Sequence, residues 1–545
     1  MRTSSIMLFV LLLSTNCFAA NYNITASDQL VDGDTFCSGV CQPDDTLTIT
    51  EDMGDLTLRD MHGSSGHPII LKNPSDKKVT LTNNGLYSAN ISIFYSTFVS
   101  VEGDKYSGEE FGIVCVNDAQ TYTPKIANVW IAYNCDDINV SYVEGYSVNN
   151  TTNTGLGIRV IGATGETSST VYNNISLTHN YIHDTVGEGM YVGNNTPATG
   201  STASIANAII RDNLLVDLGA GGIALKQVTT STNYIEYNVI RASNRASGES
   251  TGLKKDYPHE TDFAIRVLDS IDNPTNYIRY NRVEKAWYSG IEFGDSSKNT
   301  IADGNIVLGC GLDPSPPHES EIAGITFEYI QGDSSASNNI VIQAVGYGFY
   351  DRYNPSGAQA TYSNNQIADC GDGEVGGNGY IGGYLTDGGG NNYQANVSSL
   401  PSAIVWNSEY PSEEDYSNDY FNINFSTSGL LSGTLTCTSD PRNVTNSISA
   451  YLPMQMTIDS SDPGSFAAGT AASTPSGTSV SHTESVACGA SYTRYIYIAD
   501  YWGETEYGPI EVNFSVDSGE SPETPLPGPA AGFMQGIVMG GVIKQ

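Results

Sequence analysis

Residues 174–184 read Asn-Ile-Ser-Leu-Thr-His-Asn-Tyr-Ile-His-Asp, and residues 207–217 read Asn-Ala-Ile-Ile-Arg-Asp-Asn-Leu-Leu-Val-Asp. In both stretches apolar and polar residues alternate on either side of a central asparagine, Asn180 or Asn213. Such alternation is typical of a β-strand with one buried face, and asparagine tolerates the left-handed conformation of a tight corner. Each stretch therefore predicts two short strands that meet at an asparagine corner, where stacked asparagine side chains can bond to one another.

The same unit recurs between residues 130 and 400. Its corner asparagines, which are spaced 33, 25, 43 and 24 residues apart, are Asn180, Asn213, Asn238, Asn281 and Asn305. The short spacings fit one coil of three short strands, and the long ones add loops. One such coil cannot bury its own apolar face, but stacked coils can. We therefore predict a right-handed parallel β-helix over residues 21–402 of an all-β chain, because the period is too short for ankyrin repeats or propeller blades.

The coil pattern stops after Tyr393, and a different pattern follows. Residues 403–517 contain longer alternating segments, which predict a small antiparallel β-sandwich of the immunoglobulin or fibronectin type. Residues 518–545 are a Pro/Gly-rich linker and an apolar tail, which is shorter than the roughly 20 residues that a membrane span needs. We expect no membrane span.

The first twenty residues predict a secretory signal peptide, with Arg2, a short apolar run and small residues around Ala19. Cleavage removes Cys17 and leaves eight cysteines, an even number that suits an oxidising compartment. We therefore expect a secreted or cell-surface monomer. Proximity in the sequence suggests the disulfides Cys37–Cys41, Cys115–Cys135, Cys310–Cys370 and Cys437–Cys488.

The charge balance excludes some partners. The chain has 545 residues with 23 Lys and Arg, 60 Asp and Glu, and a net charge of −37. Nucleic acids and anionic membranes are bound through Lys and Arg, so we expect neither as a partner.

Equivalent positions of successive coils lie about 4.8 Å apart. Outward-facing residues at equivalent positions therefore form a continuous column on the protein surface. Aligning the strands that begin with glycine places Arg159, Tyr191, Arg266 and Glu292 in one outward column, with Lys226 in the next column. Ionisable groups of different types thus gather on one face. This is what acid and base catalysis requires.

The residue types suit β-elimination on a uronic-acid polysaccharide. Lys226 is the predicted base, with a pKa lowered by burial and by the charge of Arg266. Arg266 is expected to pair with the uronate carboxylate or to support the leaving group. Tyr191 is an alternative proton donor, and Glu292 is a further candidate acid or base. Each of these residues also has a structural interpretation as ordinary surface charge or aromatic packing.

Further residues are candidates for binding. Lys254 and Lys255 lie in the long loop before Arg266 and predict a local basic cleft. The other candidate substrate-binding residues, which include two aromatic side chains suited to stacking on a sugar, are Arg159, Trp287 and Tyr288. Glu188 and Asp262 precede strands on either side of Lys226, and their oxygens could hold Ca²⁺.

The opening rung Leu56-Thr-Leu-Arg59 and the rungs 189–193 and 222–226 resemble those of secreted bacterial β-helix proteins of the polysaccharide-lyase type, over about residues 45–400. Lys226 and Arg266 on neighbouring coils resemble the alginate and chondroitin lyases of polysaccharide lyase family six. The resemblance implies that Lys226 is the base and that Ca²⁺ lies beside it. The family's acidic pair before the lysine is here Gly219-Ala-Gly-Gly222, and pectate-lyase and pectin-hydrolase motifs are absent from the sequence.

Two alternatives to a lyase remain open. A glycoside hydrolase would use paired carboxylates, for which Glu292 and Glu328 are candidates, expected two coil steps apart at about 10 Å. A non-catalytic glycan-binding or adhesion protein would use the same surface without turnover. Product analysis separates the three.

Overall fold

The computed structural model describes residues 19–518, apart from several gaps. The gaps are residues 84–88, 104–110, 119–126, 149–154, 161–169, 194–202, 242–262, 271, 287, 295, 312–321, 353–357, 378–384, 395–403, 407–420, 424, 440, 451–453, 466–468, 470–478 and 501–505. The expected signal peptide up to residue 18 and nearly all of the predicted linker and tail therefore lie outside the described residues. The chain divides into two compact units, Met1–Pro401 and Ser402–Gln545.

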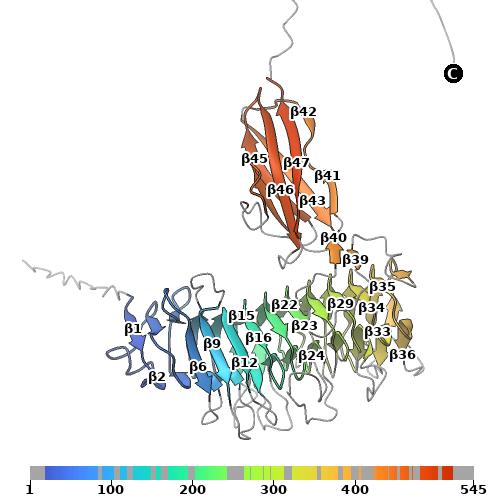
Figure 1. Ribbon diagram of the computed structural model, residues 1–545. Coiled ribbons are helices and arrows are strands. Elements are labelled where there is room, and N and C mark those ends of the chain that lie inside the picture. The colour runs from blue at the N-terminus through green and yellow to red at the C-terminus, as the bar shows by residue number, and fades with distance from the viewer. Residues whose placement is uncertain are drawn as a thin grey trace, which may run out of the picture. The chain divides into compact units, whose positions relative to one another are not determined.

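The first unit is a solenoid with three walls, each a parallel sheet. Figure 1 shows the strands of each wall stacked along the solenoid axis. In the described residues, sheet A consists of thirteen strands: β1 (Asn21–Ile24), β3 (Thr46–Ile49), β5 (Ile69–Lys72), β8 (Thr97–Glu102), β11 (Asp136–Ser141), β15 (Ile175–Thr178), β19 (Ile209–Arg211), β22 (Thr232–Glu236), β25 (Thr275–Arg279), β28 (Thr300–Asp303), β31 (Ser334–Ser337), β34 (Ala360–Ser363) and β37 (Leu385–Asp387).

The other two walls are shorter by one and two strands. Sheet B consists of β2 (Leu30–Asp32), β4 (Leu56–Arg59), β7 (Ala89–Phe94), β10 (Ala127–Ala132), β13 (Leu156–Val160), β17 (Met190–Val192), β21 (Ile223–Lys226), β24 (Ile265–Leu268), β27 (Ile291–Phe293), β30 (Ile325–Glu328), β33 (Tyr347–Arg352) and β36 (Gly373–Gly377). Sheet C consists of β6 (Val79–Asn83), β9 (Ile113–Asn117), β12 (Val143–Ser147), β16 (Tyr181–His183), β20 (Leu214–Val216), β23 (Val239–Arg241), β26 (Arg282–Glu284), β29 (Ile306–Leu308), β32 (Ile340–Ile342), β35 (Gln366–Ala368) and β38 (Asn392–Gln394). A separate parallel pair consists of β14 (Val171–Asn173) and β18 (Ser204–Ala206), which directly precede β15 and β19 of sheet A in the chain.

From β5 onward the chain passes through sheets A, C and B in turn, so each complete coil there supplies one strand to each wall, whereas β1 to β4 alternate between sheets A and B. Parallel connections of this kind are right-handed in nearly all proteins, and the predicted right-handed parallel β-helix is confirmed. Alternate residues of each strand point inward and stack in register. One such inward column, buried to at least 99%, consists of Ile158, Met190, Ile223, Ile265 and Ile291. These columns are the apolar core that one coil could not form alone.

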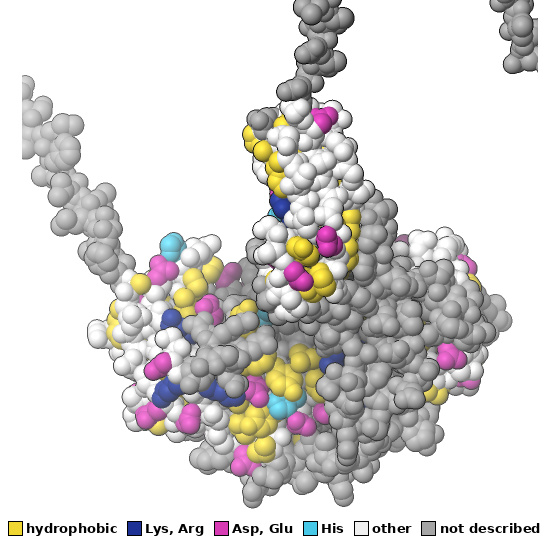
Figure 2. Space-filling view, turned by 45° about the horizontal axis from the view of Figure 1, so that its top comes forward, with side chains coloured by type: hydrophobic (Ala, Val, Ile, Leu, Met, Phe, Trp, Pro, Cys, Tyr) yellow, Lys and Arg dark blue, Asp and Glu magenta, His cyan; other side chains and the backbone are white. Residues whose placement is uncertain are grey.

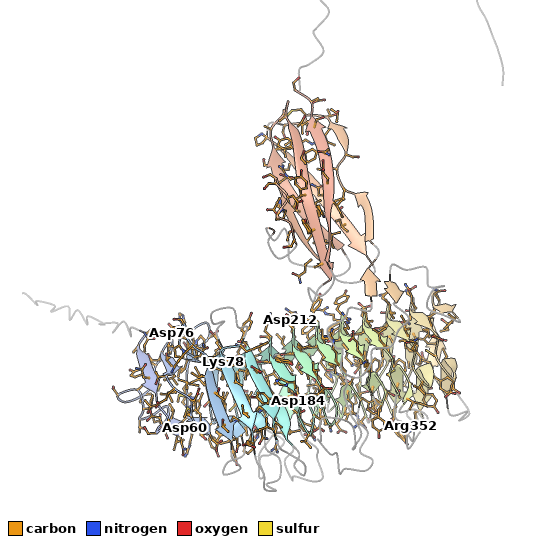
Figure 3. The ribbon with its side chains drawn as sticks, in the orientation of Figure 1. Asp60, Asp76, Lys78, Asp184, Asp212 and Arg352 are labelled. Atoms are coloured by element: carbon orange, nitrogen blue, oxygen red, sulfur yellow. A yellow bond between two sulfur atoms is a disulfide. The ribbon has the colours of Figure 1, made fainter. Side chains whose placement is uncertain are left out.

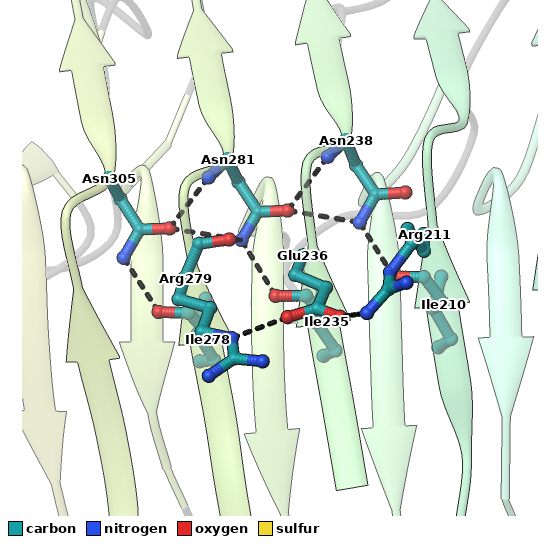
Figure 4. A network of polar contacts seen from close by, with 9 residues as sticks. All are labelled: Ile210, Arg211, Ile235, Glu236, Asn238, Ile278, Arg279, Asn281 and Asn305. Carbon is teal, nitrogen blue, oxygen red and sulfur yellow. Dashed lines mark hydrogen bonds and ion pairs between the residues drawn. The ribbon is translucent and has the colours of Figure 1, made fainter. Parts of the chain in front are cut away.

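An asparagine ladder runs along the corner between sheets A and C. The side-chain amide of each asparagine donates to the side-chain oxygen of the next at 2.9–3.0 Å, and also to a backbone carbonyl of the preceding coil (Figure 4). The ladder consists of Asn180, Asn213, Asn238, Asn281, Asn305, Asn339, Asn365 and Asn391. Side-chain bonding between stacked asparagines is as predicted.

The expectation that these asparagines are left-handed is wrong. The residue before each ladder asparagine has the positive φ instead, as at His179 (55°), Asp212 (56°) and Tyr237 (58°). The ladder asparagine must point inward to reach the carbonyl oxygens, so the preceding residue makes the corner. Corner residues at opposite edges of sheet C include Asp212 and Asp184, both labelled in Figure 3.

Two of the four expected disulfides are present. Cys37–Cys41 and Cys437–Cys488 are bonded, whereas Cys115–Cys135 and Cys310–Cys370 are not. The thiol of Cys135 instead donates to the carbonyl oxygens of Ile93 and Ala132. Cys115 lies in strand β9 of another wall, fully buried. These two disulfides were predicted from proximity along the chain. That criterion fails here because neighbouring segments of a coil face the core from different walls.

The second unit is a β-sandwich, as predicted. One sheet consists of β41 (Phe425–Gly429), β43 (Arg442–Ala450) and β45 (Ser479–Val486), and the other of β42 (Gly433–Leu435), β47 (Glu506–Val516), β46 (Ser491–Asp500) and β44 (Met454–Asp459). All described pairings are antiparallel except β42 with β47. Residues of both sheets form one core, which includes Val444, Val480, Ile496 and Phe514. Strands β39 (Ile404–Trp406) and β40 (Phe421–Ile423) pair separately. In the described parts of the chain, no helix is long and apolar enough to cross a membrane.

Candidate active site

The outward face of sheet B carries the predicted column. Trp130, Arg159, Tyr191, Ala224, Arg266 and Glu292 are partners in register across β10, β13, β17, β21, β24 and β27. Lys226 lies two residues beyond Ala224 in β21, opposite Leu268. The structure therefore brings together four of the predicted catalytic residues and one predicted binding residue on neighbouring coils.

Glycines make this close stacking possible. A Cβ atom at Gly222, the residue before β21, would lie 2.5 Å from the carbonyl oxygen of Ala264 on the next coil. Gly193 has a φ of +112°, and a Cβ there would lie 2.0 Å from the carbonyl oxygen of Lys226. The Gly-x pattern of the sequence thus marks places where the backbones of successive coils approach without side chains between them.

Lys226 is a nearly buried amine, with 7% of the residue exposed. Its Nζ lies 4.7 Å from the ring centroid of Tyr191, a cation–π distance. Burial, followed by the charge of Arg266, lowers the pKa of Lys226 to about 8, against the opposing effect of three nearby carboxylates. Burial also raises the pKa of the Tyr191 phenol, so that this hydroxyl stays protonated near neutral pH.

Arg266 contacts one acidic and one aromatic side chain of the described residues. Its Nε forms an ion pair with the fully buried carboxylate of Glu292, and its guanidinium carbon lies 5.3 Å from the ring centroid of Phe263. Gly294 makes room for this pair, because a Cβ there would lie 2.5 Å from a carboxylate oxygen of Glu292. Glu292 is therefore the counter-ion that positions Arg266, and its burial argues against the expected role as an acid or base.

Arg159 lies farther along the same column. Its guanidinium carbon is 5.0 Å from the ring centroid of Trp130. Burial lowers the pKa of Arg159 to about 10, opposed by Tyr191, Glu188 and Tyr133. In the described part of the chain, the buried indole N–H of Trp130 meets no hydrogen-bond acceptor.

Sequence reasoning missed Trp130 and the aromatic side chains around it. Phe94 packs edge-on against Trp130 and Tyr133, with ring centroids 5.1 and 5.0 Å away, and Tyr95 stacks on Tyr133 at 5.2 Å. The signal was present: Trp130 stands two residues after Asn128, as Arg159 stands two residues after Gly157. An alignment anchored on glycine did not include the coil that has asparagine there.

The charges of the site are balanced rather than basic. Among the described residues, three cations lie near three anions: Arg159, Lys226 and Arg266 near Glu188, Glu292 and Asp269. Asp269, which directly follows β24, was not among the residues predicted from the sequence. The expected basic cleft depended partly on Lys254 and Lys255, which lie outside the described residues.

Several other candidates are only partly placed. Trp287 and Asp262 lie outside the described residues. Tyr288 is half-buried just before β27, and its carbonyl oxygen accepts from the backbone N–H of Gly311. Within the described residues, no three His, Cys, Asp or Glu side chains form a metal-binding group. Glu188 alone does not supply the six to eight oxygen ligands that Ca²⁺ takes.

The carboxylates of the hydrolase alternative are both paired with arginine. Glu328 contacts Arg352 at 2.8 Å, and Glu292 contacts Arg266. The expected separation of two coil steps is wrong, because β27 and β30 are adjacent strands. One coil step and two residues along the strand correspond to about 8 Å between their Cα atoms.

The chain matches no known protein-family model, and no curated protein matches it. Solved structures similar to it include a lacto-N-biosidase from Eubacterium ramulus, with 12% identity, 69% of this chain and 68% of that chain covered, and a TM-score of 0.38. An alginate lyase from Paenibacillus sp. has 12% identity, coverages of 67% and 99%, and a TM-score of 0.37. A mannuronic acid specific polysaccharide family 6 lyase from human gut microbiota has 11% identity, coverages of 68% and 91%, and a TM-score of 0.34. Proteins of the polysaccharide-lyase type are thus among the similar structures.

Proposed function

We propose that the chain is a secreted polysaccharide-degrading enzyme that cleaves a uronic-acid glycan by β-elimination, with Lys226 as the base. The observation that carries this proposal is the buried amine of Lys226 beside Tyr191 and Arg266, with a pKa lowered to about 8. A lysine with the ordinary pKa of about 10.4 is almost fully protonated at pH 8 and takes up no proton. An amine with a pKa near 8 is about half neutral there and acts as a general base.

The reaction conserves protons and electrons among these groups. The neutral amine of Lys226 takes the proton on the carbon next to the uronate carboxylate. The electron pair left behind forms a carbon–carbon double bond and expels the glycosidic oxygen on the neighbouring carbon. That oxygen receives a proton from the hydroxyl of Tyr191 or from the newly formed ammonium at 226. The products are an unsaturated sugar and a new chain end.

Arg266 and the aromatic side chains hold the substrate in this proposal. Glu292 contacts Arg266 through Nε and fixes the guanidinium, whose Nη atoms suit a bidentate contact with the uronate carboxylate. Such a contact stabilises the negative charge that develops when the proton leaves. Trp130 and Arg159 lie two and one coils before Tyr191, where they would bind neighbouring sugars by stacking and charge.

Calcium beside the site stays a prediction. The described side chains do not form a complete calcium site, so no step above depends on the ion. If Glu188 and Asp262 hold Ca²⁺, the protein will bind it in calorimetry, and Glu188→Gln will weaken that binding.

Product analysis tests the proposal directly. Wild-type protein incubated with alginate, chondroitin and pectate should produce an ultraviolet-absorbing unsaturated product on at least one of them, with and without Ca²⁺ supplied. New reducing ends without absorbance would indicate a hydrolase instead. Binding without either product would indicate the non-catalytic alternative. Lys226→Ala should slow the rise in absorbance by at least about 10²-fold, whereas Lys77→Gln, which removes a charge far from this column in sequence, should leave the rate unchanged.

Secretion is part of the proposal. Two disulfides in the described residues, one in each unit, suit an oxidising compartment. Recovery of the mature protein from the medium, with an N-terminus close to residue 20, would support export. The predicted monomeric state is checked by light scattering of the purified protein.

A further inference from the structure

The outer face of sheet A carries an aromatic and basic strip on a different wall from Lys226. Tyr234 of β22 and Tyr277 of β25 are partners in register, and their rings stack with centroids 5.4 Å apart and planes 10° from parallel. The guanidinium carbon of Arg279 lies 5.0 and 5.4 Å from the two ring centroids. Both tyrosines are only half-buried. The strip therefore presents aromatic edges and a cation to solvent.

A second guanidinium belongs to the same strip. Arg211 of β19 and Arg279 both form ion pairs with Glu236, which is fully buried between them (Figure 4). The three side chains carry a net charge of +1, and the side chains of Arg211 and Arg279 are 42% and 33% exposed. A guanidinium has five N–H donors, and the ion pair with Glu236 uses one nitrogen of each. Nε of Arg211 is buried, so the exposed part of each side chain, rather than every donor, is what a ligand can reach.

Neighbouring acidic groups do not cancel this charge through contacts. Asp303, the register partner of Arg279, accepts hydrogen bonds from Ser337 at 2.9 Å and Asn338 at 2.7 Å. Asp212 lies 3.7 Å from His179. In the part of the chain that the structure describes, Glu236 is the only carboxylate in ion-pair contact with Arg211 or Arg279.

The strip is long and narrow. Ile209, which is 37% exposed, precedes Tyr234 in the same column, and Ile301 follows Tyr277. Four successive coils span about 14 Å along the axis. Arg211 and Arg279 lie two coils apart, at about 10 Å. This geometry suits a linear ligand that lies along the solenoid and carries regularly spaced negative groups with apolar faces between them.

We propose that the strip defined by Arg211, Tyr234, Tyr277 and Arg279 is a second glycan-binding surface, which holds a linear polysaccharide rich in carboxylates away from the Lys226 site. Guanidinium groups pair with carboxylates, and the exposed edges of the two stacked tyrosine rings offer an apolar surface for the sugars between those carboxylates. Charge complementarity supports this occupant, because only 23 of 545 residues are Lys or Arg and two of them meet here around one carboxylate. The identity of the polymer rests on the proposed function.

Removing one arginine alone would take away one of the two ion-pair partners of the buried Glu236 carboxylate, and a loss of stability would then obscure any effect on binding. The test variant is therefore Arg211→Gln/Glu236→Gln/Arg279→Gln, which removes all three charges and keeps hydrogen-bonding amides. A second variant, Tyr234→Ala/Tyr277→Ala, removes the rings and keeps the charges. Lys77→Gln is the matched control, because it changes the net charge by the same amount outside the strip.

Binding is measured by retardation in native gels that contain alginate, chondroitin sulfate or polygalacturonate, with Lys226→Ala in every protein so that turnover cannot remove the polymer. The expected result is about fivefold weaker retardation for both test variants, with the Lys77→Gln control unchanged. Equal retardation of the control and of every folded test variant would overturn the proposal. Circular dichroism establishes folding, and the tyrosine pair decides the question if the triple variant does not fold.

A second measurement separates this inference from the proposed function. With Lys226 intact, the triple variant should show a raised KM for polymer and an unchanged kcat on short oligosaccharides. If the wild type turns over no polymer, the proposed function fails, but the gel experiment still decides whether the strip binds. If turnover is present and polymer KM does not change, the proposed strip is wrong and the Lys226 site stands.

Discussion

Lys226 shows how a single side chain acquires unusual chemistry from its position. Burial and the charge of Arg266 lower its pKa to about 8, so the neutral, proton-accepting form becomes abundant as the pH rises through this value. The rate measured as kcat/KM should therefore increase with pH along an ascending limb centred near 8. Lys226→Ala should lower kcat by about 10²- to 10⁴-fold. A wild-type rate that does not depend on pH between 6 and 9 would contradict the role as base.

Asp55 is a second residue whose environment determines its protonation. It lies just before β4, opposite Asn90, and is 6% exposed. Its Oδ1 meets no hydrogen-bond partner among the described residues. Burial raises the pKa of Asp55 from 3.8 to about 7. The folded state therefore binds more protons than the unfolded state between these values, and this contribution to stability is complete below about 3.8 and lost as the pH rises through about 7.

Asp55→Asn should remove the loss of stability that Asp55 causes as the pH rises. The asparagine amide can donate hydrogen bonds as Asn90 does to the carbonyl oxygens of Leu81 and Val116. At pH 8 the variant should be more stable than the wild type, by at most about 4 kcal/mol, and the difference should shrink at pH 4. Thermal unfolding of both proteins at the two pH values measures this. A variant less stable at pH 8 would show that the carboxylate has a stabilising partner.

At the scale of the element, the asparagine ladder is the main polar support of the solenoid. Asn281 donates to the carbonyl oxygen of Ile235 at 2.8 Å and accepts from the backbone N–H and the side chain of Asn238. Asn281→Ala removes these bonds and leaves a buried N–H without an acceptor, which should lower the free energy of unfolding by about 3 kcal/mol. Chemical denaturation measures the change. Asn391→Ala, at the half-exposed end of the ladder, is the control and should cost less; equal effects would contradict a cooperative buried ladder.

The elements were predictable from the sequence because their pattern is local. Alternation around Asn180 and Asn213 indicates short strands, and repetition indicates stacked coils. The left-handed residue at each corner was assigned wrongly, because it depends on where the asparagine amide finds its acceptors on neighbouring coils. The thiols of Cys115 and Cys135 were paired wrongly for a similar reason, since the wall that each one faces depends on the whole coil.

The candidate site was predictable only in part: the spacing of glycines in the sequence indicates which residues of neighbouring coils lie in register. Aligned glycines placed Arg159, Tyr191, Arg266 and Glu292 in one column, as the structure has them. The ion pair of the buried Glu292 with Arg266 depends on the directions in which the side chains point. The spacing of residues along the sequence does not give these directions. Trp130 was missed because asparagine replaces glycine in its coil.

At the scale of the whole molecule, the net charge of −37 is the dominant electrostatic feature. Figure 2 shows Asp and Glu side chains scattered over the visible face, with fewer Lys and Arg side chains among them. Mutual repulsion of these charges opposes the compact state, and salt screens it, because the Debye length falls from about 30 Å at 0.01 M to about 10 Å at 0.1 M. The Tm should therefore rise between 10 mM and 300 mM NaCl. A Tm that falls would indicate that exposed ion pairs outweigh the repulsion.

Stacking of coils makes Lys226 and Arg266, forty residues apart, electrostatic neighbours in a nearly buried site. Nuclear magnetic resonance titration of protein labelled with ¹³C-lysine measures this coupling, with Lys226→Arg identifying the signal. We expect an apparent pKa of about 8 for Lys226, which moves upward in Arg266→Gln/Glu292→Gln. An ordinary pKa near 10.4 that does not respond to the change at 266 would show that the two side chains are not coupled.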